Sequence, residues 1–339
     1  MEALRSQVPL APRTTLGVGG NAEWYGEART VEDLRAFSQF AQENQLPLRV
    51  LGSGSNVLVS DHGVHAVVVR PLFSEIVYAK EDGDVLVTAG AGVVLDVLVA
   101  DCVAQGLWGL ENLSAIPGTV GALPIQNVGA YGVEAKDVVV SVSVYDPHLD
   151  AIIEMSNAAC AFAYRDSFFK QDGKHLIITA VTFRVSRAPR PTLAYKDLAM
   201  RFGDTGTLPT LHAIRAAIIE IRCAKFPDWH SIGTAGSFFK NPIIPRVQYE
   251  ALRATYPDMP GFSDGAEHIK VALGWILDHV CGLRGYMEGK VGLFEAQALV
   301  LVCARGATAE DIVAFSEKVI ADVYTKTKIN IEREVTLFL

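Results

Sequence analysis

Residues 116–132 read Ile-Pro-Gly-Thr-Val-Gly-Ala-Leu-Pro-Ile-Gln-Asn-Val-Gly-Ala-Tyr-Gly. Four glycines and two prolines among these seventeen residues exclude a regular helix or strand. The loop is long compared with the about 4–6 residues of a usual connection, and long ordered loops are more often functional than incidental. This stretch is therefore a candidate ligand-binding loop.

A second glycine-rich turn, Gly52-Ser-Gly-Ser-Asn56, lies about sixty residues earlier in the chain. It follows a strand-like segment, but Val57 replaces the third glycine of G-x-G-x-x-G and the next segment is also strand-like, which argues against a Rossmann fold. Such a turn exposes backbone N–H groups that can hold phosphate, although a tight bend is the simpler explanation of the turn alone. Together the two loops predict a binding site for the diphosphate and the rings of one extended nucleotide.

Composition narrows the class of protein. The chain has 339 residues, of which 50% are hydrophobic and 20% charged, so we expect a globular protein of two or three domains. A formal net charge of −8 disfavours non-specific binding to nucleic acid or to acidic membranes. The N-terminus has no signal-like run, and Asp and Gly interrupt the apolar stretch 85–103, so we expect neither export nor a membrane span.

Cysteines and histidines give no sign of a metal or a disulfide framework. The five cysteines are odd in number, far apart and never spaced as C-x-x-C, which fits a reducing cytosol. None of the eight histidines belongs to H-E-x-x-H or to a tight Cys/His cluster, and we expect His62 and His65 to face solvent. The sequence therefore predicts no metal site.

The chain changes from strand-rich to helix-rich beyond the prolines at 189 and 191, which suggest a boundary or an exposed bend. The predicted strands are 46–51, 57–59, 66–69, 84–88, 138–145, 175–185 and the period-two stretch 329–339. The predicted helices are 31–41, 93–105, 211–221, 271–280 and 312–323. Thr30 with Asp33, and Thr308 with Asp311, match the capping-box pattern at two helix starts.

Six segments of the chain resemble one family of flavoenzymes, and they occur in the same order. They are Gly52-Ser-Gly-Ser-Asn-Val-Leu, Ile116-Pro-Gly-Thr-Val-Gly-Ala, Gln126-Asn-Val-Gly-Ala-Tyr-Gly, Tyr164-Arg-Asp-Ser, Gly236-Ser-Phe-Phe-Lys-Asn-Pro and Ile331-Glu-Arg-Glu-Val. From about Thr15 to its last strand the chain resembles the UDP-N-acetylenolpyruvoylglucosamine reductases, in their longer-lidded type I form.

The resemblance implies an α+β fold: a two-part FAD-binding module of the vanillyl-alcohol-oxidase (PCMH) type and a C-terminal α+β substrate-binding domain. The expected divisions are an FAD subdomain at 1–65, a second at 66–208 and the substrate domain at 209–328, with the strand 329–339 returning near the flavin site. It further implies non-covalent FAD, NADPH as reductant and UDP-N-acetylenolpyruvoylglucosamine as substrate, reduced to UDP-N-acetylmuramate for peptidoglycan synthesis. The expected protein is a cytoplasmic monomer.

The same resemblance assigns binding residues. Those implied for FAD are Gly52, Ser53, Gly54, Ser55, Asn56, Ile116, Pro117, Gly118, Gly121, Ala122, Gln126, Asn127, Gly129, Ala130 and Tyr131. Those implied for the UDP portion or NADPH are Tyr195, Lys225, Asn241 and Gln297. Phe262 aligns with a tyrosine of a mobile lid loop, so ring stacking is expected to survive while the hydroxyl contact is lost.

The family reaction delivers a hydride to the methylene carbon of an enolpyruvyl ether, and negative charge then spreads from the neighbouring carbon into its carboxylate. Such a site needs a cation or acid at the carboxylate and a proton donor opposite the flavin. The resemblance implies Arg165 for the carboxylate, Ser237 as proton donor and Glu334 as the group that stabilises the enol with Arg165. Without the resemblance, the simplest interpretation of Arg165 is a member of a surface ion pair, that of Ser237 is a turn residue, and that of Glu334 is an exposed residue of a strand.

Two other functions stay open on the sequence alone. One is a different FAD-dependent oxidoreductase of the same fold that acts on an alcohol, which would need a base near the flavin and no Ser237. The other is a flavin- or nucleotide-binding module without catalysis, which would have no use for Arg165, Ser237 and Glu334 together.

Overall fold

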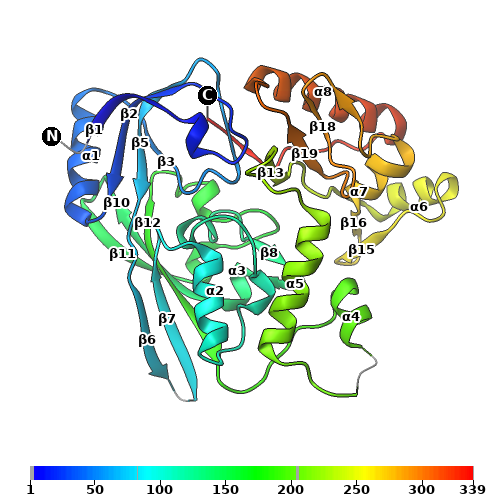
Figure 1. Ribbon diagram of the computed structural model, residues 1–339, viewed down its shortest axis with the longest axis horizontal. Helices are drawn as coiled ribbons and strands as arrows, with labels where there is room; N and C mark the ends of the chain where they lie inside the picture. Colours follow the sequence, from blue (N-terminus) through cyan, green and yellow to red (C-terminus); the bar gives the residue numbers. More distant parts are fainter. Residues whose placement is uncertain (1–3, 82, 204–205, 339) are drawn as a thin grey trace. The chain divides into compact units, whose positions relative to one another are not determined.

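The computed structural model describes residues 4–81, 83–203 and 206–338. The chain forms two compact units, each built from several stretches of sequence (Figure 1). Unit 1 comprises Met1–Val8, Ala22–Ser53 and His65–Arg222, and unit 2 comprises Pro9–Asn21, Gly54–Val64 and Cys223–Leu339. The glycine-rich turn at 52–56 is one of the places where the chain passes from unit 1 to unit 2.

The larger sheet of unit 1 is antiparallel, with five strands in the order β11-β10-β12-β7-β6. Its strands are β6 (Ile76–Glu81), β7 (Asp84–Gly90), β10 (Val139–Asp146), β11 (Ala151–Ser156) and β12 (Ile177–Ser186). Alternate β-branched residues of β7, β10 and β12 are fully buried, and α2 (Leu95–Ala104) adds Leu98 and Val99 to the same core. This core supports the long glycine-rich loop.

The second sheet of unit 1 has the order β1-β2-β5-β3, from β1 (Leu4–Pro9), β2 (Asn21–Ala28), β5 (Val64–Pro71) and β3 (Leu48–Val50). The helix α1 (Val31–Glu43) packs its buried face into the core of this sheet. Thr30 Oγ1 accepts the Asp33 N–H at 3.1 Å while the Asp33 carboxylate accepts the Thr30 N–H at 3.0 Å, so the predicted capping box is confirmed.

The remaining elements of unit 1 are short, apart from one long helix. They are the strand pair β8 (Gly129–Ala130) and β9 (Val133–Glu134), the helices α3 (Ala135–Val138), α4 (Lys196–Phe202) and α5 (Leu211–Lys225, whose last three residues belong to unit 2), and the 3₁₀ turns Glu111–Leu113, Val120–Ala122, Ala158–Cys160 and Phe168–Lys170. Residues 187–190 form the exposed bend that the prolines predict.

The described residues of unit 2 form three sheets and one long helix. One sheet has the order β13-β19-β18-β17 and another the order β14-β16-β15, while β20 pairs in parallel with β4. The strands are β4 (Val57–Val59), β13 (Gly233–Ser237), β14 (Ile243–Pro245), β15 (Gly261–Asp264), β16 (His268–Val271), β17 (Met287–Glu288), β18 (Val291–Leu293), β19 (Val300–Cys303) and β20 (Thr336–Phe338). The helices are α6 (Arg246–Thr255), α7 (Leu273–Trp275), α8 (Ala309–Thr327), the π turn Ile276–Val280 and the 3₁₀ turn Ala11–Arg13.

Two predicted elements of unit 2 are wrong in part. Val271 ends the strand β16, so the helix predicted from 271 begins only at Leu273, because cross-strand pairing with β15 holds Val271 extended. The terminal strand is confined to β20, although Ile329, Ile331 and Val335 are buried as the period-two pattern predicts. Extended chain buries alternate residues without a sheet partner. Leu339 lies outside the described residues.

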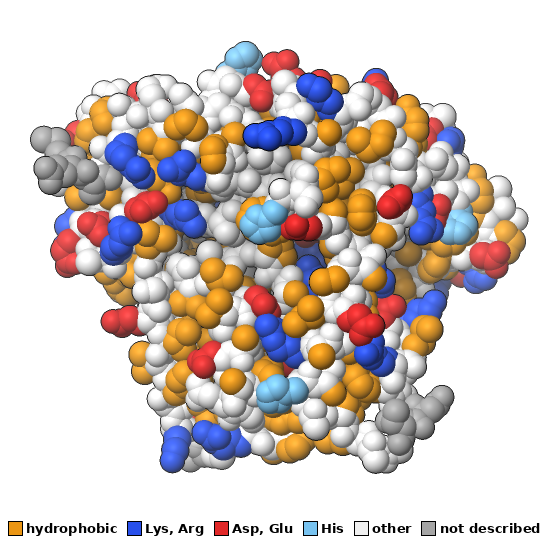
Figure 2. All heavy atoms as spheres, in the orientation of Figure 1, with side chains coloured by type: hydrophobic (Ala, Val, Ile, Leu, Met, Phe, Trp, Pro, Cys, Tyr) orange, Lys and Arg blue, Asp and Glu red, His pale blue; other side chains and the backbone are white. Residues whose placement is uncertain are grey.

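Charge is distributed without clear segregation on the face shown in Figure 2, where basic and acidic side chains are interspersed among apolar ones. This interspersion differs from the continuous basic surface that is typical of nucleic-acid-binding proteins. Among the described residues, no helix has both the length and the apolar character needed to cross a membrane.

Candidate functional site

The loop 116–132 is fastened by backbone hydrogen bonds to the segment that follows strand β7 of unit 1. The N–H of Val120 donates to the Val93 carbonyl at 2.8 Å, and the N–H of Gly121 donates to the Ala91 carbonyl at 3.0 Å. Its regular structure is limited to a 3₁₀ turn and the two residues of β8, as its glycines and prolines predict. The loop is thus ordered by its anchors and not by a helix or strand of its own.

The turn at 52–56 meets this loop and has the donors that a phosphate needs. A Cβ added to Gly52 would lie 3.0 Å from Thr119 Oγ1. Ser53 Oγ is buried and has no hydrogen-bond partner within the described part of the chain, and the N–H groups of residues 52–54 likewise bond to no described residue. A buried hydroxyl with neighbouring backbone N–H donors, beside a residue without a side chain, fits the phosphates of FAD, the cofactor that the sequence implies.

Gly54 fixes the shape of this turn within unit 2. Its φ of +67° lies in the left-handed region, and a Cβ there would lie 2.2 Å from the Arg13 carbonyl oxygen. The Gly54 carbonyl in turn accepts the Thr15 N–H at 3.1 Å. Only glycine meets both conditions.

Arg165 lies in a tight turn that is tied to the glycine-rich loop. The side chain of Asn127 donates to the Ala163 carbonyl at 3.1 Å, Ser167 Oγ donates to the Ile125 carbonyl at 2.6 Å, and Arg165 Nη2 lies 3.5 Å from the Gly129 carbonyl oxygen. The turn stands between two 3₁₀ turns, and an isolated bridge between Ala163 and Asp166 closes it.

The backbone of Arg165 is strained, with φ of +52°. A non-glycine residue in this region is uncommon, and such residues cluster at functional sites where the surroundings hold them in place. Here the bridge between Ala163 and Asp166 closes the turn, and the bond from Asn127 to the Ala163 carbonyl holds it against the loop, so the position of the Arg165 backbone in unit 1 is fixed.

Tyr131 and Tyr195 form an aromatic pair in the same unit, with ring centroids 5.1 Å apart and an edge-to-face arrangement. Burial raises the pKa of Tyr131 to about 12, whereas Tyr195 is 45% exposed. The Asn112 side chain donates to the carbonyls of Tyr131 and Thr192, at 2.7 and 2.9 Å. Asn112 thus ties Tyr131 to the segment that leads to Tyr195, and sequence reasoning missed it.

Asn112 carries a second feature of a candidate site residue. Its Oδ1 is buried and has no partner among the residues that the structure describes. The only signal in the sequence is the polar pair Glu111-Asn112 between two leucines. Burial raises the pKa of the Glu111 carboxyl, which accepts the Gly109 N–H at 2.6 Å.

Ser237 and Glu334 lie on neighbouring backbone segments of unit 2. Ser237 ends β13 after Gly236, and the next residue, Phe238, accepts the Glu334 N–H at 2.8 Å. Phe239 and Arg333 form an isolated bridge beside this bond. Phe238 and Phe239 are fully buried, so two aromatic rings exclude water on the core side of the pair.

Asn56 connects the end of the glycine-rich turn to the same terminal segment. Its side chain donates to the Glu334 carbonyl at 3.3 Å, and its own carbonyl accepts the Thr336 N–H at 3.0 Å. Glu332, two residues earlier, is exposed and pairs with Lys240 at 3.0 Å, which agrees with a structural role for that glutamate.

Comparison with known proteins identifies the family of this chain. An FAD binding domain family matches residues 23–148, and the C-terminal domain of UDP-N-acetylenolpyruvoylglucosamine reductase matches residues 228–338. The reductase of that name from Pseudomonas aeruginosa is 40% identical over 99% of both chains, and that from Cupriavidus pinatubonensis is 42% identical over 96% of both. The chain belongs to the UDP-N-acetylenolpyruvoylglucosamine reductase family.

A solved structure of the Thermus caldophilus reductase agrees with this membership, with a TM-score of 0.69 and 25% identity over 99% of this chain and 100% of that one. The predicted fold class is confirmed: an FAD-binding module of the vanillyl-alcohol-oxidase type followed by a C-terminal α+β domain. The chain is an FAD-dependent oxidoreductase. Membership in the reductase family favours reduction of the enolpyruvyl sugar nucleotide over both an alcohol-oxidising enzyme and a non-catalytic binding module.

The residues that the family resemblance assigns to substrate or NADPH binding differ in their hydrogen bonds and in their exposure. Asn241 Oδ1 accepts the Leu273 N–H at 3.0 Å at the start of α7, so a helix-capping role accounts for its type. Gln297 Oε1 accepts the Leu299 N–H at 3.3 Å. Lys225 ends α5, and Phe262 is 59% exposed on β15. Phe262 is thus the aligned residue with the most surface left for a ligand.

Proposed function

We propose that this chain reduces UDP-N-acetylenolpyruvoylglucosamine to UDP-N-acetylmuramate, with NADPH as the reductant, and that Arg165, Ser237 and Glu334 act on the same substrate. The observation that carries the proposal is the bond between the Glu334 N–H and the Phe238 carbonyl, which keeps the proton-donor candidate beside the glutamate. Bound FAD supplies hydride transfer. We further propose that the protein acts as a cytoplasmic monomer.

The cofactor phosphates would be held by Ser53 Oγ and the N–H groups of residues 52–54, with the loop 116–122 beside them. Residues 126–131 would contact the rest of FAD, since this segment is anchored to the turn that carries Arg165. Asn56 would keep this cofactor turn at a fixed place relative to Glu334, because it bonds to the terminal segment on both sides of Val335.

Ser237 would complete the reduction by donating its hydroxyl proton. Hydride addition to the methylene carbon moves the double-bond electron pair to the neighbouring carbon, and the Oγ–H proton then passes to that carbon. A serine hydroxyl is a weak acid at neutral pH, but it suffices when the acceptor is a carbanion-like carbon. The buried rings of Phe238 and Phe239 keep competing water away from one side of the serine.

Arg165 and Glu334 would stabilise the charge that develops before this proton arrives. The planar guanidinium matches a carboxylate with two parallel N–H donors, which an ammonium group cannot do. Its anchored backbone means that little reorganisation is needed when charge appears. Tyr195, Lys225, Asn241, Gln297 and Phe262 would contribute to binding of the UDP portion or NADPH, Phe262 through its ring alone.

The two half-reactions of Ser237→Ala test this assignment. Reduction of the flavin by NADPH should proceed at the wild-type rate, whereas reoxidation by the enolpyruvyl substrate should slow by about 10²–10⁴-fold. Ser237→Cys should retain part of the second rate because a thiol can also donate a proton. Both steps are measured by stopped-flow absorbance of the flavin.

Ser231→Ala is the matched control, because Ser231 is exposed in a turn of the same unit and, among the residues that the structure describes, bonds to Asp228 alone. Neither half-reaction should change in that variant. Equal slowing of both half-reactions in Ser237→Ala would contradict the role given to the hydroxyl.

A further inference from the structure

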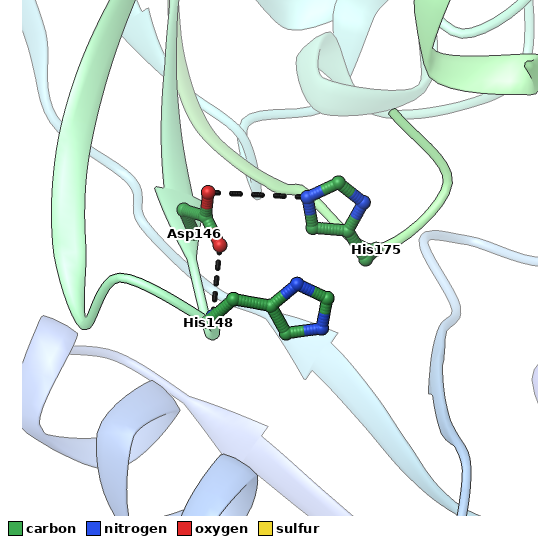
Figure 3. Close-up of side chains that lie close together, drawn as sticks. All are labelled: Asp146, His148 and His175. Atoms are coloured by element: carbon green, nitrogen blue, oxygen red, sulfur yellow. Dashed lines mark hydrogen bonds and ion pairs between the residues drawn. The ribbon is translucent and has the colours of Figure 1, made fainter. Parts of the chain in front are cut away.

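Three side chains of unit 1, two from one turn and one from 27 residues later, come together at one end of the five-stranded sheet (Figure 3). Asp146 is the last residue of β10, His148 lies in the turn to β11, and His175 precedes β12. One potential ligand atom from each lies within 4.8 Å of the other two. The antiparallel pairing of β10 with β12 creates this juxtaposition.

The carboxylate of Asp146 is already oriented toward the cluster. Its Oδ1 accepts the backbone N–H groups of His148 at 2.8 Å and Leu149 at 3.4 Å, and Oδ2 lies 3.9 Å from His175 Nε2. Asp146 is 7% exposed, so this orientation is held by a buried turn. Hydrogen bonds of this kind to one carboxylate oxygen are a usual support for a metal ligand.

The two imidazole rings are stacked, with centroids 4.6 Å apart and planes inclined by 4°. Beyond the contact between His175 and Asp146, neither ring is hydrogen-bonded to another residue that the structure describes. His148 is exposed and His175 half-buried, so an ion can reach the cluster and water can fill the other positions. The ring nitrogens thus remain available as ligands.

We propose that Asp146, His148 and His175 bind a divalent transition-metal ion of the zinc type, with water completing its coordination. Two imidazoles and one carboxylate suit Zn²⁺ better than Mg²⁺ or Ca²⁺, which prefer oxygen ligands. Metal–ligand bonds of about 2.0–2.1 Å place tetrahedral ligands about 3.4 Å apart. Side-chain rotation of the exposed His148 closes the difference from the present separations.

This site is separate from the proposed reductase chemistry, because none of its three residues is assigned to FAD or substrate. The bound ion would link the β10–β11 turn to the segment that leads into β12. It would therefore stabilise unit 1 by binding the folded chain and not the unfolded one.

Calorimetric titration of the chelator-treated, FAD-loaded full chain with zinc chloride tests the proposal. We expect one ion per chain, and we expect His148→Ala and His175→Ala each to weaken binding by about 10–100-fold. Both histidines are on the surface, so these variants should fold, whereas Asp146→Asn would also disturb the turn. His212→Ala is the control, since His212 is exposed on α5 and is no member of the cluster.

Thermal unfolding gives a second reading that does not depend on activity. Zinc should raise the Tm of the wild-type protein and of His212→Ala, and should raise it much less in the variant that lacks both His148 and His175. If the double variant binds zinc with the wild-type stoichiometry and affinity, or if the wild type binds no zinc, the proposal is wrong.

Discussion

Gly54→Ala tests whether the turn that carries the proposed phosphate donors can adopt only one backbone conformation. The left-handed conformation at φ of +67° costs an alanine about 1–2 kcal/mol. The added Cβ would also lie 2.2 Å from the Arg13 carbonyl oxygen and 2.7 Å from Thr14 Cα, so backbone must move. Overpacking of this kind costs about 1–3 kcal/mol.

Alanine also restricts the unfolded chain, which offsets about 0.4–1 kcal/mol of that loss. We therefore expect Gly54→Ala to lower the free energy of unfolding by about 2–4 kcal/mol, measured by urea denaturation. Movement of the turn would also displace Ser53 and weaken the Thr15 N–H bond to Gly54. FAD affinity, measured by quenching of flavin fluorescence, should fall by about tenfold or more.

The control variant Gly282→Ala separates the cost of the left-handed backbone from the cost of the steric clash of the added Cβ. Gly282 has φ of +69°, almost the value at Gly54, but no atom lies within 4 Å of the Cβ it would gain. This control should lose only about 1 kcal/mol and should bind FAD as the wild type does. If Gly54→Ala loses no more stability than Gly282→Ala and keeps its FAD affinity, the steric account of the turn is refuted.

Two further variants test other parts of the structure. Burial opposes charge on Asp96, but Arg215 donates to both its oxygens, at 2.6 and 2.9 Å, and with the Ala115 N–H holds its pKa below the ordinary value of 3.8. Asp96→Asn should thus lose about 1–3 kcal/mol of unfolding free energy at pH 7. That deficit should shrink as pH falls from the unfolded-state pKa through the lower folded-state pKa, because the wild-type carboxylate then also loses its charge; equal deficits by urea denaturation at pH 7 and in acid would contradict the pairing. Phe262→Tyr should lower the KM for the enolpyruvyl substrate by about 2–10-fold with kcat unchanged, by restoring one hydrogen bond, and a raised KM in steady-state kinetics would show that this loop is misaligned.

Features that depend on a few consecutive residues could be predicted from the sequence. The capping boxes at Thr30 and Thr308 mark the starts of α1 and α8, because each motif closes its own hydrogen bonds within one turn of helix. The glycine-rich turn at 52–56 is equally local, since Gly54 alone fixes its left-handed step. These predictions needed no knowledge of the rest of the fold.

Features that depend on distant partners could not be predicted in this way. The hydrophobic pattern predicts that Val271 belongs to a helix, but pairing with β15 holds this residue extended. The turn of Arg165 is held in place by bonds to Asn127 and Ile125, which lie far from it in sequence. Asn112 and the cluster of Asp146 with two histidines have no spacing signal, because strand pairing and loop anchoring bring their partners close. Roles of Arg165, Ser237 and Glu334 rest on the family resemblance, which local pattern alone does not supply.

The terminal segment buries alternate residues but forms a regular strand only at its end, and its hydrogen bonds show what this arrangement provides. On one side its residues bond to the backbone of 238–240, next to Ser237, and on the other side Asn56 bonds to Glu334 and Thr336. Extended chain with shared partners fixes the distance between Asn56 and the residues next to Ser237, while its alternate residues Ile331 and Val335 anchor it in the core.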